Sequence, residues 1–90
     1  MTVRWLDSAI ADVEQIVEYI AEHDHAAALR LRDQIVGSVE RLPDYPFMYR
    51  HGRVAGTREM LPHPNYRVVY RVAATEVQIV RVIHTRRQYP

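Results

Sequence analysis

A chain of 90 residues is long enough for one domain and too short for two, and a hydrophobic content of 48% indicates a folded core rather than a disordered chain. The absence of cysteine excludes disulfides and thiolate metal sites, and no signal-peptide pattern or long apolar run is present, so we expect a cytoplasmic protein that does not enter a membrane. The net charge is +1, but the charges are distributed unevenly along the chain. Eight of the 12 arginines but only two of the 11 acidic residues lie from residue 50 onward. This basic half predicts a surface that binds nucleic acid or an acidic protein.

The first quarter of the chain predicts a short strand and an amphipathic helix. Residues 3–6 indicate the strand, and Asp7 and Ser8 end it, because their side-chain oxygens are suited to capping the first N–H groups of a helix. Apolar residues then recur at steps of three and four, while the acidic residues fall largely off that stripe. We therefore expect a helix over about residues 8–23.

A second helix follows a break at Asp24–His25, with the same apolar spacing, and Pro43 ends it. Two helices joined by so short a turn pack as an antiparallel hairpin, here over about residues 8–42. The next stretch, residues 43–56, contains two prolines and two glycines and predicts a loop. Its apolar anchors would be Tyr45, Phe47, Met48 and Tyr49.

Three strands are expected in the remaining third. Residues 57–61 form a short one, followed by a turn around His63, which lies between two prolines. Residues 66–72 alternate, so that their tyrosines share one face and their arginines the other, and residues 77–84 are apolar on both faces, as is typical of a central strand. The order β-α-α-β-β-β predicts an α+β fold in which the helical hairpin covers one face of an antiparallel sheet.

The C-terminal half contains the stretches GTRE, HPNYRVVYRV and VIHTRRQYP, and it resembles the RelE/ParE family of toxins, most closely the ParE-like branch. The N-terminal stretch resembles these toxins at Trp5, Leu6, Ser8, Ala9, Asp12, Val13, Ile16, Tyr19 and Ile20. The resemblance covers essentially the whole chain. It implies one RelE/ParE-like domain over residues 1–90, with the helical hairpin at about 8–42 and the sheet with a basic C-terminal tail at about 57–90.

This resemblance implies the toxin of a type II toxin–antitoxin system, associated with growth arrest and plasmid stabilization. RelE-like members cleave mRNA in the ribosomal A site, whereas ParE-like members inhibit DNA gyrase, and a shared fold does not decide between them. The chain has no lysine-rich strip and no evident general-base carboxylate near Arg67. We therefore predict a toxin that binds DNA gyrase without catalysis. The alternatives are a metal-independent, ribosome-dependent mRNA endoribonuclease and an inactive member that binds only its antitoxin.

Cleavage of RNA without a metal needs a base for the 2′-hydroxyl, cations for the phosphorane and an acid for the leaving oxygen. If the protein is a nuclease, its catalytic residues are expected to be Arg67, His84 and Tyr89. Arg67 occupies the position where RelE-like nucleases carry a phosphate-stabilising arginine. The structural alternatives are that Arg67 pairs with Glu59 or Glu76, that His84 is hydrogen-bonded at the sheet edge, and that Tyr89 packs the tail onto the domain.

Target binding is predicted for four other arginines, because guanidinium groups bind phosphates and carboxylates: Arg58, Arg71, Arg86 and Arg87. Alternatively, Arg86 and Arg87 belong to a solvated tail. Arg67 and Arg71 are expected to face outward on the side of the sheet that the helices leave open. The remaining histidines lack metal-ligand spacing and no phosphate-binding loop is present, so we expect neither metal nor cofactor.

A cognate antitoxin is the expected tight partner. The helical hairpin should leave apolar surface around Ala26, Ala27, Val36, Leu29 and Tyr19, and the basic sheet face should attract acidic side chains. An antitoxin segment that is acidic and apolar would fold over both surfaces, while the toxin itself contacts no operator DNA. Residues 85–90 complete no core pattern, so their deletion should abolish toxicity and leave the fold intact.

Overall fold

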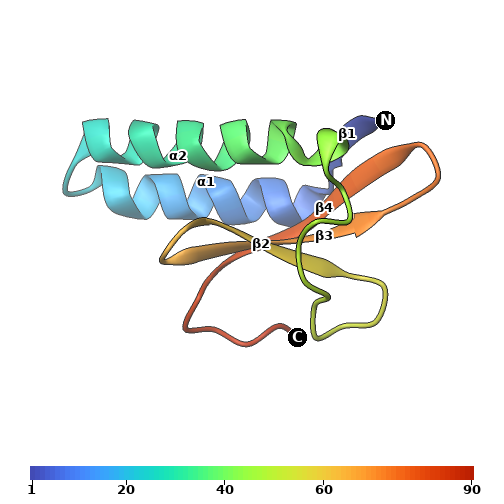
Figure 1. Ribbon diagram of the computed structural model, residues 1–90. Helices are drawn as coiled ribbons and strands as arrows, with labels where there is room; N and C mark the ends of the chain where they lie inside the picture. Colours follow the sequence, from blue (N-terminus) through green and yellow to red (C-terminus); the bar gives the residue numbers. More distant parts are fainter.

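The computed structural model describes residues 1–90 as two layers, with two helices lying along one face of a four-stranded sheet (Figure 1). The predicted α+β class and the order β-α-α-β-β-β are confirmed, with one short 3₁₀ turn added. Neither helix is long and apolar enough to span a bilayer. The elements are β1 (Thr2–Trp5), α1 (Asp7–Ala21), α2 (His25–Glu40), η1 (Leu42–Asp44), β2 (Arg58–His63), β3 (Tyr66–Val72) and β4 (Glu76–His84).

The strand order in the sheet is β1-β4-β3-β2. Strands β2, β3 and β4 are antiparallel neighbours, but β1 runs parallel to β4, with Trp5 opposite Ile79. The prediction of a wholly antiparallel sheet was therefore wrong, and the sheet is mixed. Residue periodicity indicates that a strand exists, whereas the direction of a strand that pairs far along the chain depends on the connections between them. The prediction of a central strand near the C-terminus is confirmed, because β4 has neighbours on both sides.

Two local boundaries differ from the prediction. Helix α1 already begins at Asp7 and has no side-chain cap, because the Ser8 hydroxyl instead donates to the carbonyl of Val80 at 2.6 Å. The predicted caps at Asp7 and Ser8 were wrong for that reason. Strand β2 continues through His63, two residues beyond its expected end at residue 61, so the turn follows His63 instead of containing it. An irregularity in the pairing with β3 accommodates Pro62 in this edge strand. At α2, Asp24 does cap the helix, accepting from the N–H of Ala27 at 3.0 Å.

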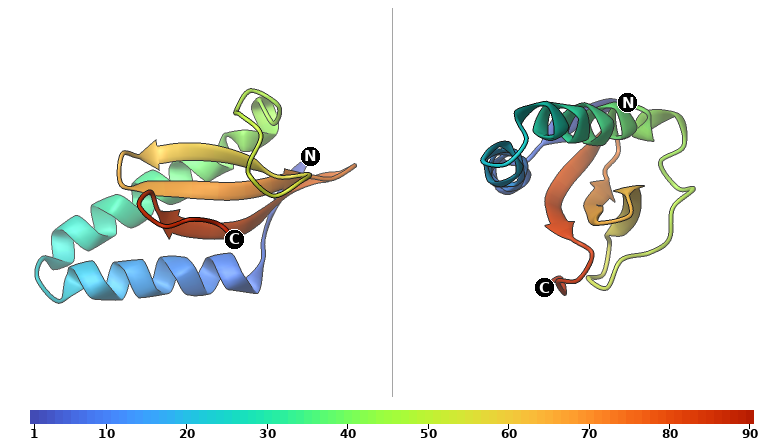
Figure 2. Two further views of the ribbon diagram at one scale, coloured as in Figure 1. Left: turned by 90° about the horizontal axis from the view of Figure 1, so that it is seen from below. Right: turned by 90° about the vertical axis from the view of Figure 1, so that its left-hand side faces the viewer.

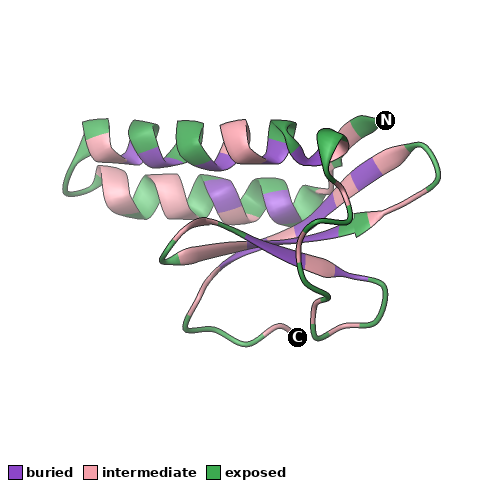
Figure 3. Cartoon of the chain, in the orientation of Figure 1, coloured by how far each residue is buried: buried purple, intermediate pink, exposed green.

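The core lies between the helices and the sheet, where the buried residues of both layers face one another (Figure 3). Apolar spacing along the helices and alternation along the strands produce this single buried surface. Its members from α1, α2 and η1 are Ala9, Val13, Leu31, Ile35, Val39 and Leu42, and those from the sheet are Met60, Val68, Tyr70, Val77, Ile79 and Val82.

The alternation along β4 changes phase at Val80. The register pairs Val69 with Arg81 but Tyr70 with Ile79, which leaves Val80 as one extra residue in β4. Such a bulge reverses the faces of the residues that follow it. As a result Ile79 and Val82, three positions apart, both reach the core.

Helix α1 covers the edge of β4 where β1 has ended. Asp12 accepts the N–H of Val82 at 2.9 Å and forms a two-pronged ion pair with Arg81, at 2.7 Å from Nε and 2.9 Å from Nη2. Ser8, one helical turn before Asp12, binds the carbonyl of Val80. The helix therefore satisfies backbone groups that would be unpaired at a sheet edge.

Candidate functional site

The sheet face opposite the helices carries the arginines of β3, as the alternation predicted. The register places Glu59 opposite Val69 and Arg67 opposite Ile83 on this face. It is less open than expected, because the C-terminal tail folds back beneath the sheet (Figures 1 and 2). The Arg67 side chain is only 16% exposed, and Val69 is fully buried, whereas Arg71 is exposed as predicted.

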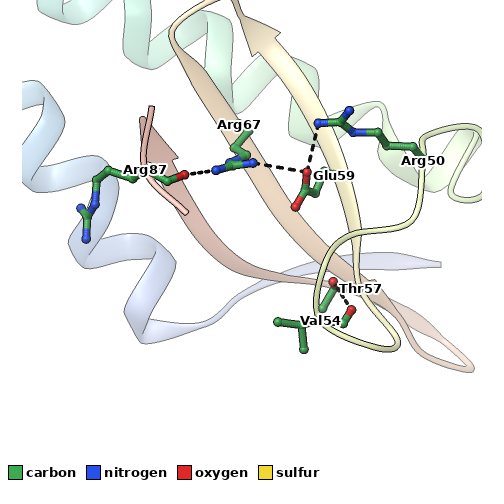
Figure 4. A network of polar contacts seen from close by, with 6 residues as sticks. All are labelled: Arg50, Val54, Thr57, Glu59, Arg67 and Arg87. Atoms are coloured by element: carbon green, nitrogen blue, oxygen red, sulfur yellow. Dashed lines mark hydrogen bonds and ion pairs between the residues drawn. The ribbon is translucent and has the colours of Figure 1, made fainter. Parts of the chain in front are cut away.

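A buried carboxylate joins two arginines on this face (Figure 4). Glu59 Oε1 lies 3.6 Å from Arg67 Nη1 and 3.3 Å from Arg50 Nη2, and the Glu59 side chain is 7% exposed. Arg67 Nη2 also donates to the backbone carbonyl of Arg87 in the tail. Arg67 Nε is buried and has no partner. The pairing of Arg67 with Glu59, one of the structural alternatives, is thus present, and it leaves one donor unused. The expectation that no carboxylate lies near Arg67 was wrong, because the pairing of β2 with β3 brings Glu59 beside it.

The loop before β2 carries Arg50 and brings one further arginine, Arg53, beside this network. Its backbone is fixed beside β2, because Gly52 N–H donates to the carbonyl of Thr57 at 2.8 Å and Glu59 N–H donates to that of Arg50 at 3.0 Å. Position 52 requires glycine, since a Cβ there would collide with Thr57 Oγ1. The result is a hollow of about 370 Å³ lined by Arg50, His51, Arg53, Glu59, Arg67, Gln88 and Tyr89. Three guanidinium groups and one carboxylate suit this hollow to an anionic group.

The three residues predicted for a nuclease do not meet at one point. Tyr89 lines the hollow together with Arg67, and its ring lies 5.8 Å from the Arg81 guanidinium. His84 instead pairs with Tyr66, on the helix-facing side of the sheet, with 5.4 Å between ring centroids. Its Nδ1 accepts the N–H of Arg86 at 3.1 Å. The structure therefore brings Arg67 and Tyr89 together and places His84 away from them.

The arginines predicted to bind a target have different environments. Arg58 donates to the carbonyls of Phe47 and Tyr49, at 3.2 and 2.8 Å, and its guanidinium lies 5.2 Å from the Phe47 ring centroid. The guanidinium of Arg58 is therefore engaged in contacts that hold the loop before β2 in place. Arg71, on the sheet face, and Arg86 and Arg87, in the tail, are exposed.

Comparison with known proteins identifies the family. Residues 3–89 match the family described as the ParE toxin of the type II toxin–antitoxin system parDE. The chain belongs to the ParE toxin family. A protein named Putative toxin Y4kP from Sinorhizobium fredii is 35% identical over 89 residues, which are 98% of this chain and 92% of that protein. Toxin RelE2 from Caulobacter vibrioides is 34% identical over 87 residues, which are 94% of this chain and 96% of that one.

Solved structures have the same fold as this ParE-family chain. The chromosomal ParDE TA system from P. aeruginosa superimposes with a TM-score of 0.83 at 25% identity, covering 93% of this chain and 95% of that one. A YoeB/ParE toxin from Agrobacterium tumefaciens gives a TM-score of 0.67 at 19% identity, covering 99% and 100%. The protein is therefore a toxin of the ParE/RelE family from a type II toxin–antitoxin system, and the parDE relationship implies an antitoxin partner.

Part of this candidate site was not predicted from the sequence. Arg50 and Arg53 lie in a loop, where no periodicity tells which face of the sheet a side chain reaches. Glu59 gave a usable signal, because it is one of only two acidic residues in the basic half of the chain. Asp12 belonged to the N-terminal resemblance, but only the structure assigns it a role, as the partner of Arg81.

Proposed function

We propose that this toxin arrests growth by binding DNA gyrase, without catalysing a reaction. The observation that supports binding over catalysis is the environment of Arg67. Its guanidinium is held by the Glu59 carboxylate and by the carbonyl of Arg87, so its charge is already partly compensated. RNA cleavage without a metal needs a cation available to the phosphorane and a proton-transfer group beside it. The carboxylate beside Arg67, Glu59, is itself held in ion pairs with Arg67 and Arg50, and His84 pairs with Tyr66 on the other side of the sheet.

Two purified systems test this proposal side by side. The toxin is added to gyrase acting on relaxed plasmid DNA, and separately to ribosomes translating a defined mRNA. Inhibited supercoiling with intact mRNA is the expected result. Cleavage of the mRNA at codon positions, with supercoiling unaffected, would replace gyrase binding with the second candidate.

That second candidate is a ribosome-dependent mRNA endoribonuclease. It is favoured by the hollow in which Tyr89 lies with Arg67, Arg50 and Arg53, because a phenol and several guanidinium groups around one space suit a phosphodiester. In that case Tyr89→Phe should abolish cleavage of mRNA on ribosomes while leaving the affinity for ribosomes within a factor of about three. Equal cleavage by the wild type and this variant would exclude Tyr89 as the proton-transfer group.

The outer surface of the helical hairpin is the proposed site of the antitoxin. A groove of about 290 Å³ lies along the two helices and is lined by Trp5, Ile10, Val13, Glu14, Arg32 and Val36. Near the turn between the helices, Tyr19 and Leu29 are 66% and 45% exposed. Apolar lining of this kind suits an amphipathic segment that folds on binding, and acidic side chains in it would be attracted to exposed arginines.

Calorimetry with the product of the adjacent small gene tests this surface. A dissociation constant well below micromolar, stronger than about −8 kcal/mol, is expected, because weaker binding would not hold a toxin silent. The toxin alone should not shift operator DNA, since operator binding is assigned to the antitoxin. A weaker constant, or a shift by toxin alone, would contradict this part of the proposal.

A further inference from the structure

The turn at residues 45–48, called here the apolar turn, presents three large apolar side chains to solvent. Tyr45, Phe47 and Met48 are 62%, 64% and 63% exposed, whereas Leu42 just before them is 1% exposed. Single exposed apolar residues are ordinary on protein surfaces, but three within four consecutive positions are not. Each leaves apolar area in water that a partner would stabilise by covering.

The backbone of the apolar turn is fixed despite its exposure. A hydrogen bond of 3.2 Å joins its last N–H to its first carbonyl, and Pro46 restricts φ within it. The hydroxyl of the buried Tyr70 donates to the carbonyl of Pro46 at 2.7 Å, and Arg58 holds the carbonyls of Phe47 and Tyr49. A surface already held in one conformation loses little entropy when it binds.

The apolar turn lies far from the end of the hairpin where Tyr19 and Leu29 are exposed. In Figure 1 the loop that contains it descends from the C-terminal end of α2, whereas Tyr19 and Leu29 flank the turn at the other end of the helices, and Figure 2 shows the same separation. Two apolar surfaces at opposite ends of the hairpin suit two different partners.

We propose that the apolar turn docks into an apolar pocket with an acidic rim on the protein whose inhibition arrests growth. This inference rests on the proposed function, in that the target is a protein, and it adds which surface of the toxin makes the contact. The antitoxin surface proposed above, which is the groove beside Trp5 and Val36 together with Tyr19 and Leu29, contains no residue of the apolar turn, so the antitoxin does not need the turn.

Charge and residue type select this partner. The loop over residues 43–56 carries Arg50 and Arg53 but only one acidic residue, Asp44, so carboxylates around the partner's pocket would complement it. Tyrosine, phenylalanine, methionine and arginine are the residue types enriched in the centres of protein interfaces. A single-stranded nucleic acid fits less well, because one face of the Phe47 ring is covered by Arg58 and Met48 offers no ring on which a base stacks.

The test uses the full-length variant Y45S/F47S/M48S, with Leu61→Ser as the matched control. Leu61 is 56% exposed and lies outside the turn, so its substitution removes the same kind of surface elsewhere. Four quantities are measured for each protein: growth arrest on expression, affinity for purified gyrase, affinity for the product of the adjacent small gene, and the denaturation midpoint. The triple variant should lose growth arrest and bind gyrase about 30-fold or more weakly. Its antitoxin affinity should stay within about threefold, and the control should match the wild type in all four measurements.

Other outcomes of these measurements would overturn the inference, or would separate it from the proposal that gyrase is the target. Unchanged arrest, or a loss of antitoxin affinity as large as the loss of gyrase affinity, would overturn the inference. Weaker binding of the variant to a single-stranded RNA oligonucleotide would overturn it in favour of nucleic acid. If wild-type toxin does not bind gyrase while the variant loses arrest and keeps its antitoxin, the gyrase proposal fails and the apolar turn stands. Should the triple variant unfold, Met48→Ser alone replaces it, with a loss of at least about fivefold expected. The Met48 side chain makes none of the anchoring contacts, and serine keeps the backbone N–H that bonds to the Tyr45 carbonyl.

Discussion

Removal of one partner from the contact between Asp12 and Arg81 should strongly destabilise this fold. Asp12→Ala removes three acceptor contacts at once, two from Arg81 and one from the N–H of Val82. The cation and the backbone donor then remain at a site where the two side chains are only 12% and 29% exposed, Asp12 being the more buried. In the wild type the Asp12 hydrogen bond raises the pKa of Arg81 above its usual value. That effect is absent in the variant, but a guanidinium does not lose its proton at neutral pH, so Arg81 keeps its charge and cannot relieve the defect.

The expected loss in the free energy of unfolding follows from the contacts that each substitution removes. Removing one partner of a buried ion pair costs about 3–5 kcal/mol, and partial exposure of Arg81 places this case near the lower end, at about 3 kcal/mol. Asp12→Asn keeps an acceptor for Val82 and loses the charge, so about 1–2 kcal/mol is expected. For a domain whose total stability is about 5–15 kcal/mol, the alanine variant should lower the melting temperature by more than about 10 °C.

Urea denaturation at neutral pH measures these differences, and a double-mutant cycle of Asp12→Ala with Arg81→Met isolates the coupling, expected to exceed about 1 kcal/mol. Asp33→Ala is the matched control, because Asp33 is 76% exposed and pairs only with its neighbour Arg32 at 3.6 Å, and it should change stability by less than about 0.5 kcal/mol. A loss below about 1 kcal/mol for Asp12→Ala, or a coupling near zero, would refute the argument that α1 is locked to β4 through this residue.

Three further predictions concern the other side of the sheet and the buried phenols. Glu59→Gln should lower the free energy of unfolding in urea by about 1–3 kcal/mol, because it leaves the half-buried guanidinium of Arg67 without its ion pair; no loss would mean that the pair is not formed in solution. Burial raises the pKa of Tyr66 and Tyr70 above the usual 10.0, so the unfolded state loses these protons first. Stability should therefore be intact below about pH 10 and fall as the pH rises further, and Tyr70→Phe should reduce that fall in an alkaline denaturation series. Deleting Thr85–Pro90 should leave a cooperative thermal transition by circular dichroism, because none of these residues belongs to the core, and should abolish growth arrest; a truncated protein without such a transition would show that the tail is structural.

The parts of the fold that depend on local periodicity were predictable. The apolar spacing of the helices and the alternation of residues 66–72 each carry their own signal, so the helical hairpin and the face shared by Arg67 and Arg71 followed from the sequence. The direction of β1 and the bulge at Val80 did not. Strand β1 pairs with β4, near the other end of the chain, and the bulge is set by the register between β3 and β4, which the pattern of a single strand does not reveal. The same holds for the helix start, where Ser8 is recruited to β4 rather than to its own helix.

The charge of the site was predictable from the sequence, but the burial of Arg67 beneath the tail was not. Alternation placed Arg67 on the correct face, and Glu59 was a foreseeable partner because it is one of only two acids in a basic half. The covering of Arg67 by the tail was not foreseeable, since residues 85–90 have no periodic pattern, and a tail rich in arginine is expected to be solvated. The hollow exists because two aperiodic segments, the loop before β2 and the tail, meet over β2 and β3, which supply Glu59 and Arg67.

The two faces of the sheet therefore contribute differently to stability and to the surface of this small toxin. The helix-facing side holds the core and depends on Asp12 and Arg81 to close the edge of β4, so substitutions there should act on stability first and on every activity equally. The opposite side lies outside the core cluster, and besides the buried Val69 and Ile83 it contains the buried ion pair between Glu59 and Arg67. Buried ion pairs are weak contributors to stability compared with apolar packing, so this arrangement is better explained by the surface that it presents than by the stability it provides. Growth arrest should accordingly be sensitive to residues of this side and of the loop that borders it, in variants whose denaturation midpoints are unchanged.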